Sequence, residues 1–268
     1  MNTACPTTIT MSIAMWFDFH PEPSVHDSAM TRALHFTTGD IQSRMRLQDP
    51  FALDLQYTRL MMGFLLFDPA PVNVAIIGLG GGSIPKFCYR HLPHTHIRVV
   101  EINPHVIAMR DVFYVPADDS RLSVVLADGA LFVRDQILRH GVLMVDGFLG
   151  HGLPSRLSSQ RFYDDCRQAL SPGGILVANL HSDHPHLQAQ IDRIRRSFGD
   201  ALLVVEDSKK GNTIVFARAS TLGPDLIGPW LARTPKALDR TGANQLLGAF
   251  STVRNAIKRQ FVQISPEG

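Results

Sequence analysis

The sequence predicts an α/β protein with a Rossmann-like, mainly parallel sheet, and three observations lead to this prediction. From Val72 onward, short apolar runs of the strand type alternate with segments whose apolar residues recur at the helical period. The runs are almost continuous in Val, Ile and Leu, which is typical of parallel strands covered by helices on both faces. The last two runs are separated only by Ser208–Gly211, which leaves no room for a crossover helix and indicates an antiparallel hairpin.

The region before the sheet, residues 1–71, is expected to form an N-terminal extension. Turn chemistry at Thr38–Asp40, between the two β-prone pieces of residues 33–45, predicts a small β-hairpin. Residues 49–67 then predict a helix, because Asp49-Pro50 supplies an N-cap followed by a proline at the first helical position.

The central region, residues 72–219, is expected to bind a nucleoside. The five runs expected to be parallel strands are residues 72–78, 96–102, 122–128, 141–147 and 173–180, and the closing hairpin is formed by residues 201–207 and 212–219. Five parallel strands followed by an antiparallel hairpin correspond to the seven-stranded sheet of the class I S-adenosylmethionine-dependent methyltransferases.

The C-terminal region, residues 220–268, is expected to be a helical tail. Apolar residues at helical spacing indicate a helix that docks on the sheet or on a partner subunit. The residues expected on its apolar face are Leu247, Phe250, Ile257 and Phe261.

Composition restricts the functional classes. The chain has 268 residues, 45% hydrophobic and 19% charged, with a net charge of +2, which is typical of a soluble globular protein and argues against nucleic acid as a partner. Its three cysteines fit neither a disulfide framework nor a zinc spacing. We find no signal-peptide pattern and no apolar run of the ~20 residues that a membrane helix needs, so a cytoplasmic location without membrane contact is expected. Met11 or Met15 is an alternative start.

The strand ends carry the chemistry, because ligands of open α/β sheets bind beyond the carboxyl ends of the parallel strands. Glycines after the first strand allow close approach of a ligand to the backbone. A carboxylate on the second strand suits the two hydroxyls of a ribose. The residues at the five ends are Gly78-Leu79-Gly80-Gly81-Gly82, Glu101-Ile102, Asp128-Gly129, Asp146-Gly147 and Asn179.

The two remaining acids help to identify the ligand. Asp128 is placed to accept a hydrogen bond from an adenine amino group, and a plain Asp-Gly turn is an equally good interpretation of that pair. Asp146 suits a cationic sulfonium and disfavours a pyrophosphate. The pattern therefore favours an adenosine derivative with a cationic tail over a dinucleotide.

These residues resemble a known family, spermidine synthase and the related polyamine aminopropyltransferases, from about Ala33 to Ala219. The resemblance rests on IIGLGGGSIPK, VVEINPHVI, LADGALFV, LMVDGFLGHGLP and SSQRFYDDCRQALSPGGILVANL. It implies a homodimer formed through the N-terminal region and a small-molecule amine or polyamine acceptor. The implied reaction is aminopropyl transfer from decarboxylated S-adenosylmethionine, without a metal.

The resemblance also implies roles for individual residues. Gln42 and Tyr57 would shape the substrate pocket, and Asp146 would lie close to the reacting end. The residues implied to bind the cofactor are Gly78, Gly80, Gly81, Gly82, Glu101, Ile102, Asp128, Gly129 and Asp146.

The chain departs from the family pattern at two acidic positions. Gly81 stands where the family has an aspartate that helps to hold the amine of the donor, and Leu149 stands where it has a catalytic aspartate. Two alternatives therefore stay open beside aminopropyl transfer. One is a methyltransferase that uses ordinary S-adenosylmethionine, and the other is a nucleoside-binding relative without catalysis.

Histidine clusters are expected to be polar loops and not metal sites, because no cysteine or supporting acid accompanies HLPHTH or HSDHPH. His151, in the loop after Asp146, is a further candidate proton acceptor, since a neutral imidazole accepts protons near pH 7.

Overall fold

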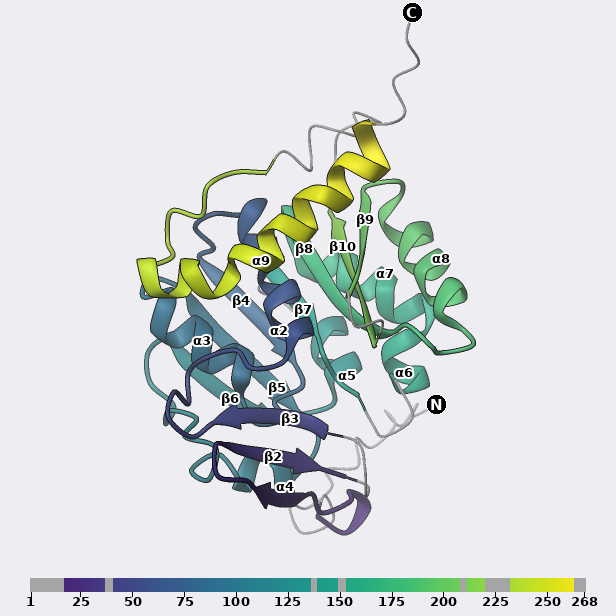
Figure 1. The fold of residues 1–268 in the computed structure, drawn as a ribbon. Coiled ribbons are helices and arrows are strands. Elements are labelled where there is room, and N and C mark those ends of the chain that lie inside the picture. Colours follow the sequence, from purple (N-terminus) through teal and green to yellow (C-terminus); the bar gives the residue numbers. More distant parts are fainter. Residues whose placement is uncertain are drawn as a thin grey trace, which may run out of the picture.

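Two sheets organise the chain in the computed structural model, which describes residues 17–36, 41–135, 139–148, 153–207, 211–219 and 232–262 (Figure 1). The larger sheet has seven strands in the order β6-β5-β4-β7-β8-β10-β9. Its strands are β4 (Asn73–Ile77), β5 (His96–Glu101), β6 (Leu122–Leu126), β7 (His140–Val145), β8 (Leu170–His181), β9 (Leu202–Glu206) and β10 (Asn212–Arg218). Only β10 runs antiparallel to its neighbours, β8 and β9. The predicted class I methyltransferase sheet is confirmed.

Helices cover both faces of this sheet because alternate residues of its central strands point in opposite directions. Val74 and Ile76 of β4 join one core, whereas Ala75 and Ile77 join another. The first core is covered by α3 (Ser83–His91), α4 (Pro104–Ala108) and α9 (Arg240–Ile257), and the second by α5 (Gly129–Arg134), α6 (Ser155–Ser158), α7 (Gln160–Ala169) and α8 (Leu187–Phe198). This two-sided burial explains why the strands are apolar throughout.

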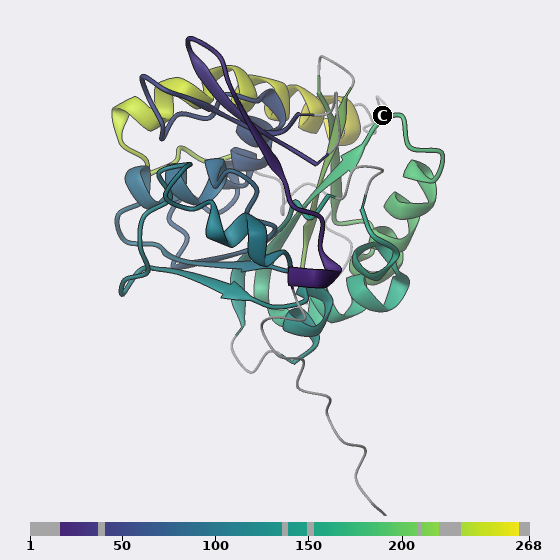
Figure 2. The same cartoon turned by 90° about the horizontal axis from the view of Figure 1, so that it is seen from below.

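The N-terminal extension forms a three-stranded antiparallel sheet of β1 (Ser24–Asp27), β2 (Thr31–His35) and β3 (Ile41–Arg46). The predicted hairpin corresponds to β2 and β3, but β1 was not predicted. Its sequence, SVHD, is mostly exposed and has no apolar alternation to mark it as a strand. This small sheet lies beside the carboxyl ends of the parallel strands, which Figures 1 and 2 show from two sides.

The prediction of one helix over residues 49–67 is wrong about the residue at which the helix begins and about the residue that caps it. The helical residues are divided between α2 (Gln56–Met61) and the 3₁₀ helix η1 (Met62–Leu66). Asp49 caps neither of them. Tertiary contacts hold the preceding segment outside the helix, because the Leu53 N–H donates to Gln245 at 3.2 Å and Asp54 pairs with Arg46 at 2.8 Å. Such contacts override the local helix signal.

The C-terminal helix α9 begins after Asp239, whose carboxylate accepts the Gly242 N–H at 2.7 Å, and it continues into the π-helical turn η3 (Lys258–Val262). The helix docks on α2 and β9, as Figure 1 shows where it crosses in front of the strands. Leu247 was expected on the docked face, yet its side chain is 63% exposed and Leu246 is buried instead. No helix in the described ranges is long and apolar enough to cross a membrane.

Candidate functional site

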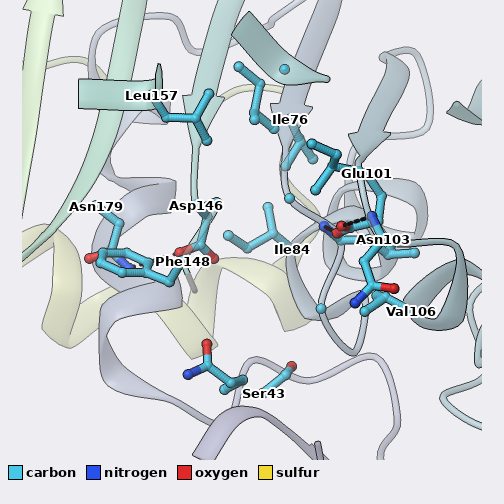
Figure 3. A pocket seen from close by; sticks show the side chains of 18 of the residues that line it. Ser43, Ile76, Ile84, Glu101, Asn103, Val106, Asp146, Phe148, Leu157 and Asn179 are labelled. Carbon is cyan, nitrogen blue, oxygen red and sulfur yellow. Dashed lines mark hydrogen bonds between the residues drawn. The ribbon is translucent and has the colours of Figure 1, made fainter. Parts of the chain in front are cut away.

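A cavity of about 500 Å³ opens at the carboxyl ends of the parallel strands. It lies where the strand order reverses between β4 and β7, the usual ligand position in such sheets (Figure 3). The structure brings all five strand ends to this cavity and adds side chains from β3 and α2. The sequence-predicted residues that line it are Gln42, Tyr57, Gly78, Gly80, Glu101, Ile102, Asp128, Gly129, Asp146 and Asn179.

The turn after β4 requires glycines, because neighbouring backbone and side-chain atoms occupy the space that a Cβ would need. Gly78 has φ +100°, and a Cβ there would lie 2.3 Å from the carbonyl oxygen of Asp146. Gly82 has φ +67°, and a Cβ there would lie 2.3 Å from Val115. Gly80 lines the cavity, whereas Gly81 and Gly82 pack behind it.

Glu101 is nearly buried at the end of β5, and its two carboxylate oxygens fix two loops. One oxygen accepts the Leu79 N–H at 2.8 Å and the other accepts the Asn103 N–H at 2.8 Å, as drawn in Figure 3. Burial raises the pKa of Glu101, and these backbone hydrogen bonds oppose that rise. Each oxygen keeps a second lone pair, so the carboxylate can also accept hydrogen bonds from a ligand.

Asp128 caps the helix that follows β6, and it also lines the cavity. One oxygen caps α5 by accepting the Ala130 N–H at 2.8 Å, and the other lies 3.1 Å from Arg156. The next position, Gly129, has no space for a side chain, because a Cβ there would lie 2.4 Å from the Ile77 side chain. The pair thus begins helix α5 and does not form a plain turn, and contact of Asp128 with an adenine stays a prediction.

Asp146 lies at the centre of a hydrogen-bonded chain that sequence reasoning did not foresee. The side-chain amide of Asn179 of β8 donates to its carboxylate at 2.8 Å, and the side-chain oxygen of Asn179 accepts from the side-chain amide of Asn212 at 3.0 Å. The Tyr57 hydroxyl also donates to Asp146. Burial raises the pKa of Asp146 to about 6, against the opposing effect of Asn179 and Tyr57. A carboxylate with such a pKa is ionised at neutral pH and still accepts a proton readily.

Aromatic and polar side chains form the wall of the cavity near Asp146. Phe148 and His181 line it with their rings 4.6 Å apart, and Gln42 contributes an amide from β3. The region is therefore partly aromatic and partly polar, which suits an amine carried on an apolar chain.

Several lining residues were missed by sequence reasoning. Ser83 lies within the glycine motif and Asn103 caps α4, so each belongs to a recognisable local signal. Ser43 and His20 carried no signal, because they reach the cavity only through the packing of the N-terminal extension. The Asn103 side chain holds that extension by donating to the Pro21 carbonyl at 2.8 Å.

The candidate proton acceptor His151 lies outside the described residues, and so does Leu149, which stands at the place of the family's catalytic aspartate. Within the described ranges, no group of three or more His, Cys, Asp or Glu side chains is arranged to hold a metal ion.

Comparison with known proteins identifies the family. The profile of the spermine/spermidine synthase domain matches residues 54–205, which is more than half of the chain. The chain belongs to the spermine/spermidine synthase family. A polyamine aminopropyltransferase of Neisseria meningitidis (serogroup A) is 38% identical over 205 residues, covering 75% of this chain and 77% of the relative. That of Chromobacterium violaceum is 37% identical over 198 residues, covering 74% and 76%.

Solved structures agree with the fold. A probable spermidine synthase from Corynebacterium glutamicum superposes with a TM-score of 0.66 at 19% identity, over 92% of this chain and 93% of the other. Human methyltransferase-like protein 13, solved with S-adenosylhomocysteine, gives a TM-score of 0.53 at 22% identity, over 79% and 91%. At these identities the likeness shows the fold alone.

The structure gives a physical reason for one departure from the spermine/spermidine synthase pattern. A Cβ at Gly81 would lie 2.8 Å from the Ser43 hydroxyl and 2.9 Å from the Phe113 ring. Both distances are shorter than a carbon atom tolerates. The aspartate of the family pattern therefore has no room here unless Ser43 and Phe113 move.

Proposed function

We propose that this protein binds an S-adenosyl sulfonium nucleoside in the cavity and transfers an alkyl group from its sulfur to the nitrogen of an amine. One observation carries the proposal. Glu101 at the end of β5 and Asp146 after β7 line the same cavity on either side of β4, where the strand order reverses. A carboxylate at each position serves the two ends of such a ligand, the ribose and the sulfonium.

The fit of the nucleoside rests on residues of β5 and β6. Glu101 is fixed by two backbone N–H groups and accepts the ribose hydroxyls with its remaining lone pairs. Asp128 and Gly129 lie at the adenine side, and the apolar side chains Ile102 and Ile77 line the space between.

The chemical step needs orientation and removal of a proton. The amine nitrogen forms a bond to a carbon on sulfur, the bond from that carbon to sulfur breaks, and a neutral thioether leaves. Asp146 receives the proton of the amine, since its carboxylate is ionised at neutral pH and its pKa is about 6. Tyr57 and Asn179 hold the carboxylate in place through their hydrogen bonds.

Two donors are compatible with this chemistry. Decarboxylated S-adenosylmethionine would deliver an aminopropyl group to an amine or polyamine, and membership of the spermine/spermidine synthase family supports it. Ordinary S-adenosylmethionine would deliver a methyl group. The space filled by Ser43 and Phe113 at Gly81 favours this second candidate, because it excludes the loop aspartate that suits the decarboxylated donor.

Binding of methylthioadenosine, measured by calorimetry, tests the nucleoside site. We expect Glu101→Ala to abolish binding, because the variant loses both the ribose contact and the hydrogen bonds that fix the Leu79 and Asn103 loops. Asp135→Ala, which changes an exposed acid after α5, is the matched control and should bind like the original protein. Unchanged affinity in Glu101→Ala would refute the assignment of the ribose contact.

Product formation then tests the transfer. Either donor is incubated with putrescine, spermidine or a monoamine, and the alkylated amine is measured. Nucleoside binding without product from any of these amines would support a non-catalytic relative and contradict the proposed transfer.

A further inference from the structure

An ion pair between Asp128 and Arg156 joins two elements that line the cavity. Asp128 caps α5 after β6, and Arg156 belongs to α6. A guanidinium nitrogen of Arg156 lies 3.1 Å from one carboxylate oxygen of Asp128, and both side chains line the cavity. The carboxylate side chain is 10% exposed, whereas the Arg156 side chain is 63% exposed. The pair therefore places a nearly buried acceptor beside a largely exposed set of donors.

Packing around α6 fixes the position from which Arg156 extends. The side chain of Leu157, the next residue, is buried and lies against Gly147, where a Cβ would be only 2.7 Å from it. In addition, Arg193 of α8 donates to the Ser158 carbonyl at 3.0 Å. Helix α6 also contacts α5 and α7. Arg156 is thus held at the cavity by its helix and not by the ion pair alone.

The hydrogen-bonding groups of this pair are only partly used. The carboxylate oxygen Oδ1 of Asp128 accepts the N–H groups of Ala130 at 2.8 Å and Leu131 at 3.3 Å. The other oxygen, Oδ2, faces Arg156 and keeps a second lone pair for a ligand. A guanidinium has five N–H donors, and that of Arg156 makes no other ion pair or hydrogen bond to a described residue. The pair therefore offers a ligand one acceptor and several adjacent donors.

An adenine base has the complementary pattern. Its polar edge presents the amino group, which is a donor, next to a ring nitrogen, which is an acceptor. An ionised carboxylate cannot donate and a guanidinium cannot accept, so the amino group matches Asp128 and the ring nitrogen matches Arg156. Arginine suits such a planar, paired contact because its donors form a rigid fork.

We propose that Arg156 binds the adenine base directly, by donating to a ring nitrogen while Asp128 accepts from the neighbouring amino group. Arg156 is then a specificity-determining residue, because a base without that nitrogen loses the contact. The inference rests on the proposed function, in which the adenine lies beside Asp128 and Gly129, and it adds a second side chain that recognises the base.

Calorimetry on the full chain tests this contact with methylthioadenosine. A hydrogen bond from a charged donor contributes about tenfold in affinity, so Arg156→Ala should weaken binding by about that factor. The matched control, Arg161→Ala, removes an arginine of α7 that is 77% exposed and is not among the residues that line the cavity. This control should bind like the original protein. Unchanged affinity in Arg156→Ala overturns the inference.

Two analogues separate a contact with the base from a structural role of the ion pair. They are the 1-deaza and 7-deaza forms of methylthioadenosine, each of which has a carbon in place of one ring nitrogen. For the analogue that lacks the contacted nitrogen, Arg156→Ala and the original protein should bind within about twofold of each other. The other analogue should again show the loss of about tenfold. An equal loss for all three nucleosides would mean that Arg156 only supports α6 or Asp128, which contradicts the inference.

Methylthioadenosine also separates this inference from the proposed function. If it binds equally well to the original protein and to Arg156→Ala, only the inference fails. If no nucleoside binds at all, the proposed function fails and the inference fails with it.

Discussion

At the scale of single residues, the most informative side chain is Asp146, which β7 carries to a point where Tyr57 and Asn179 hydrogen-bond its carboxylate. The carboxylate has no buried cation as a partner among the groups that shift its pKa, and burial raises that pKa to about 6. Asp146 is thus suited to accept a proton from an amine at neutral pH.

Asp146→Asn should lower the rate of transfer at least about 100-fold, because the amide accepts no proton. Affinity for methylthioadenosine should stay within about threefold, which shows that the variant is folded.

The pH profile of the original protein gives a second measurement of the same group. Because the raised pKa means that the carboxyl ionises only near pH 6, the rate should rise between pH 5 and pH 7 and then level off. A rate that is independent of pH through this interval, or a fully active Asp146→Asn variant, would exclude Asp146 as the proton acceptor.

At the scale of elements, α9 shows how tertiary packing chooses among neighbouring apolar residues. Leu246, Phe250 and Val253 are buried against the first core, whereas Leu247 is largely exposed. The two adjacent leucines are about 100° apart around the helix, so only one of them faces the sheet.

Leu246→Ala should therefore lower the free energy of unfolding by about 2–4 kcal/mol, through lost burial and a residual cavity. The matched change Leu247→Ala should lie within about 0.5 kcal/mol of the original protein. Urea denaturation measures both, and similar losses in the two variants would show that α9 is docked on a different face.

At the scale of the whole molecule, the N-terminal extension and the methyltransferase-like region share one core. Leu34 and Met45 of the small sheet belong to the same apolar cluster as Phe87 of α3 and Leu246 of α9. The division into residues 1–71, 72–219 and 220–268 remains a prediction about organisation along the chain.

We propose that two copies associate through the N-terminal extension, where the apolar side chain of Met30 is 54% exposed. Sedimentation velocity should then give twice the 29.7 kDa mass of the chain at micromolar concentration. Met30→Asp should shift the equilibrium toward single copies, whereas Val72→Asp, an exposed residue before β4, should not. A single copy at all concentrations would contradict the proposal.

The sequence by itself determined the sheet and the groups at its strand ends. Apolar runs in the sequence indicate which strands are buried on both faces. Directly after these runs in the chain come the glycine turn, Glu101 and Asp146. Because the parallel strands of an α/β sheet end at one edge, local patterns were sufficient to predict that these residues meet.

Only the tertiary structure decided what surrounds them. The contacts of Asp146 with Tyr57, and of Gly81 with Ser43, join residues far apart in the chain, and no local periodicity encodes such contacts. The glycine stretch after β4 predicted a nucleoside site, but which of its glycines line the cavity was decided only by the folded structure. The start of α2 was missed for the same reason, because side chains from β3 and α9 hold the segment before it.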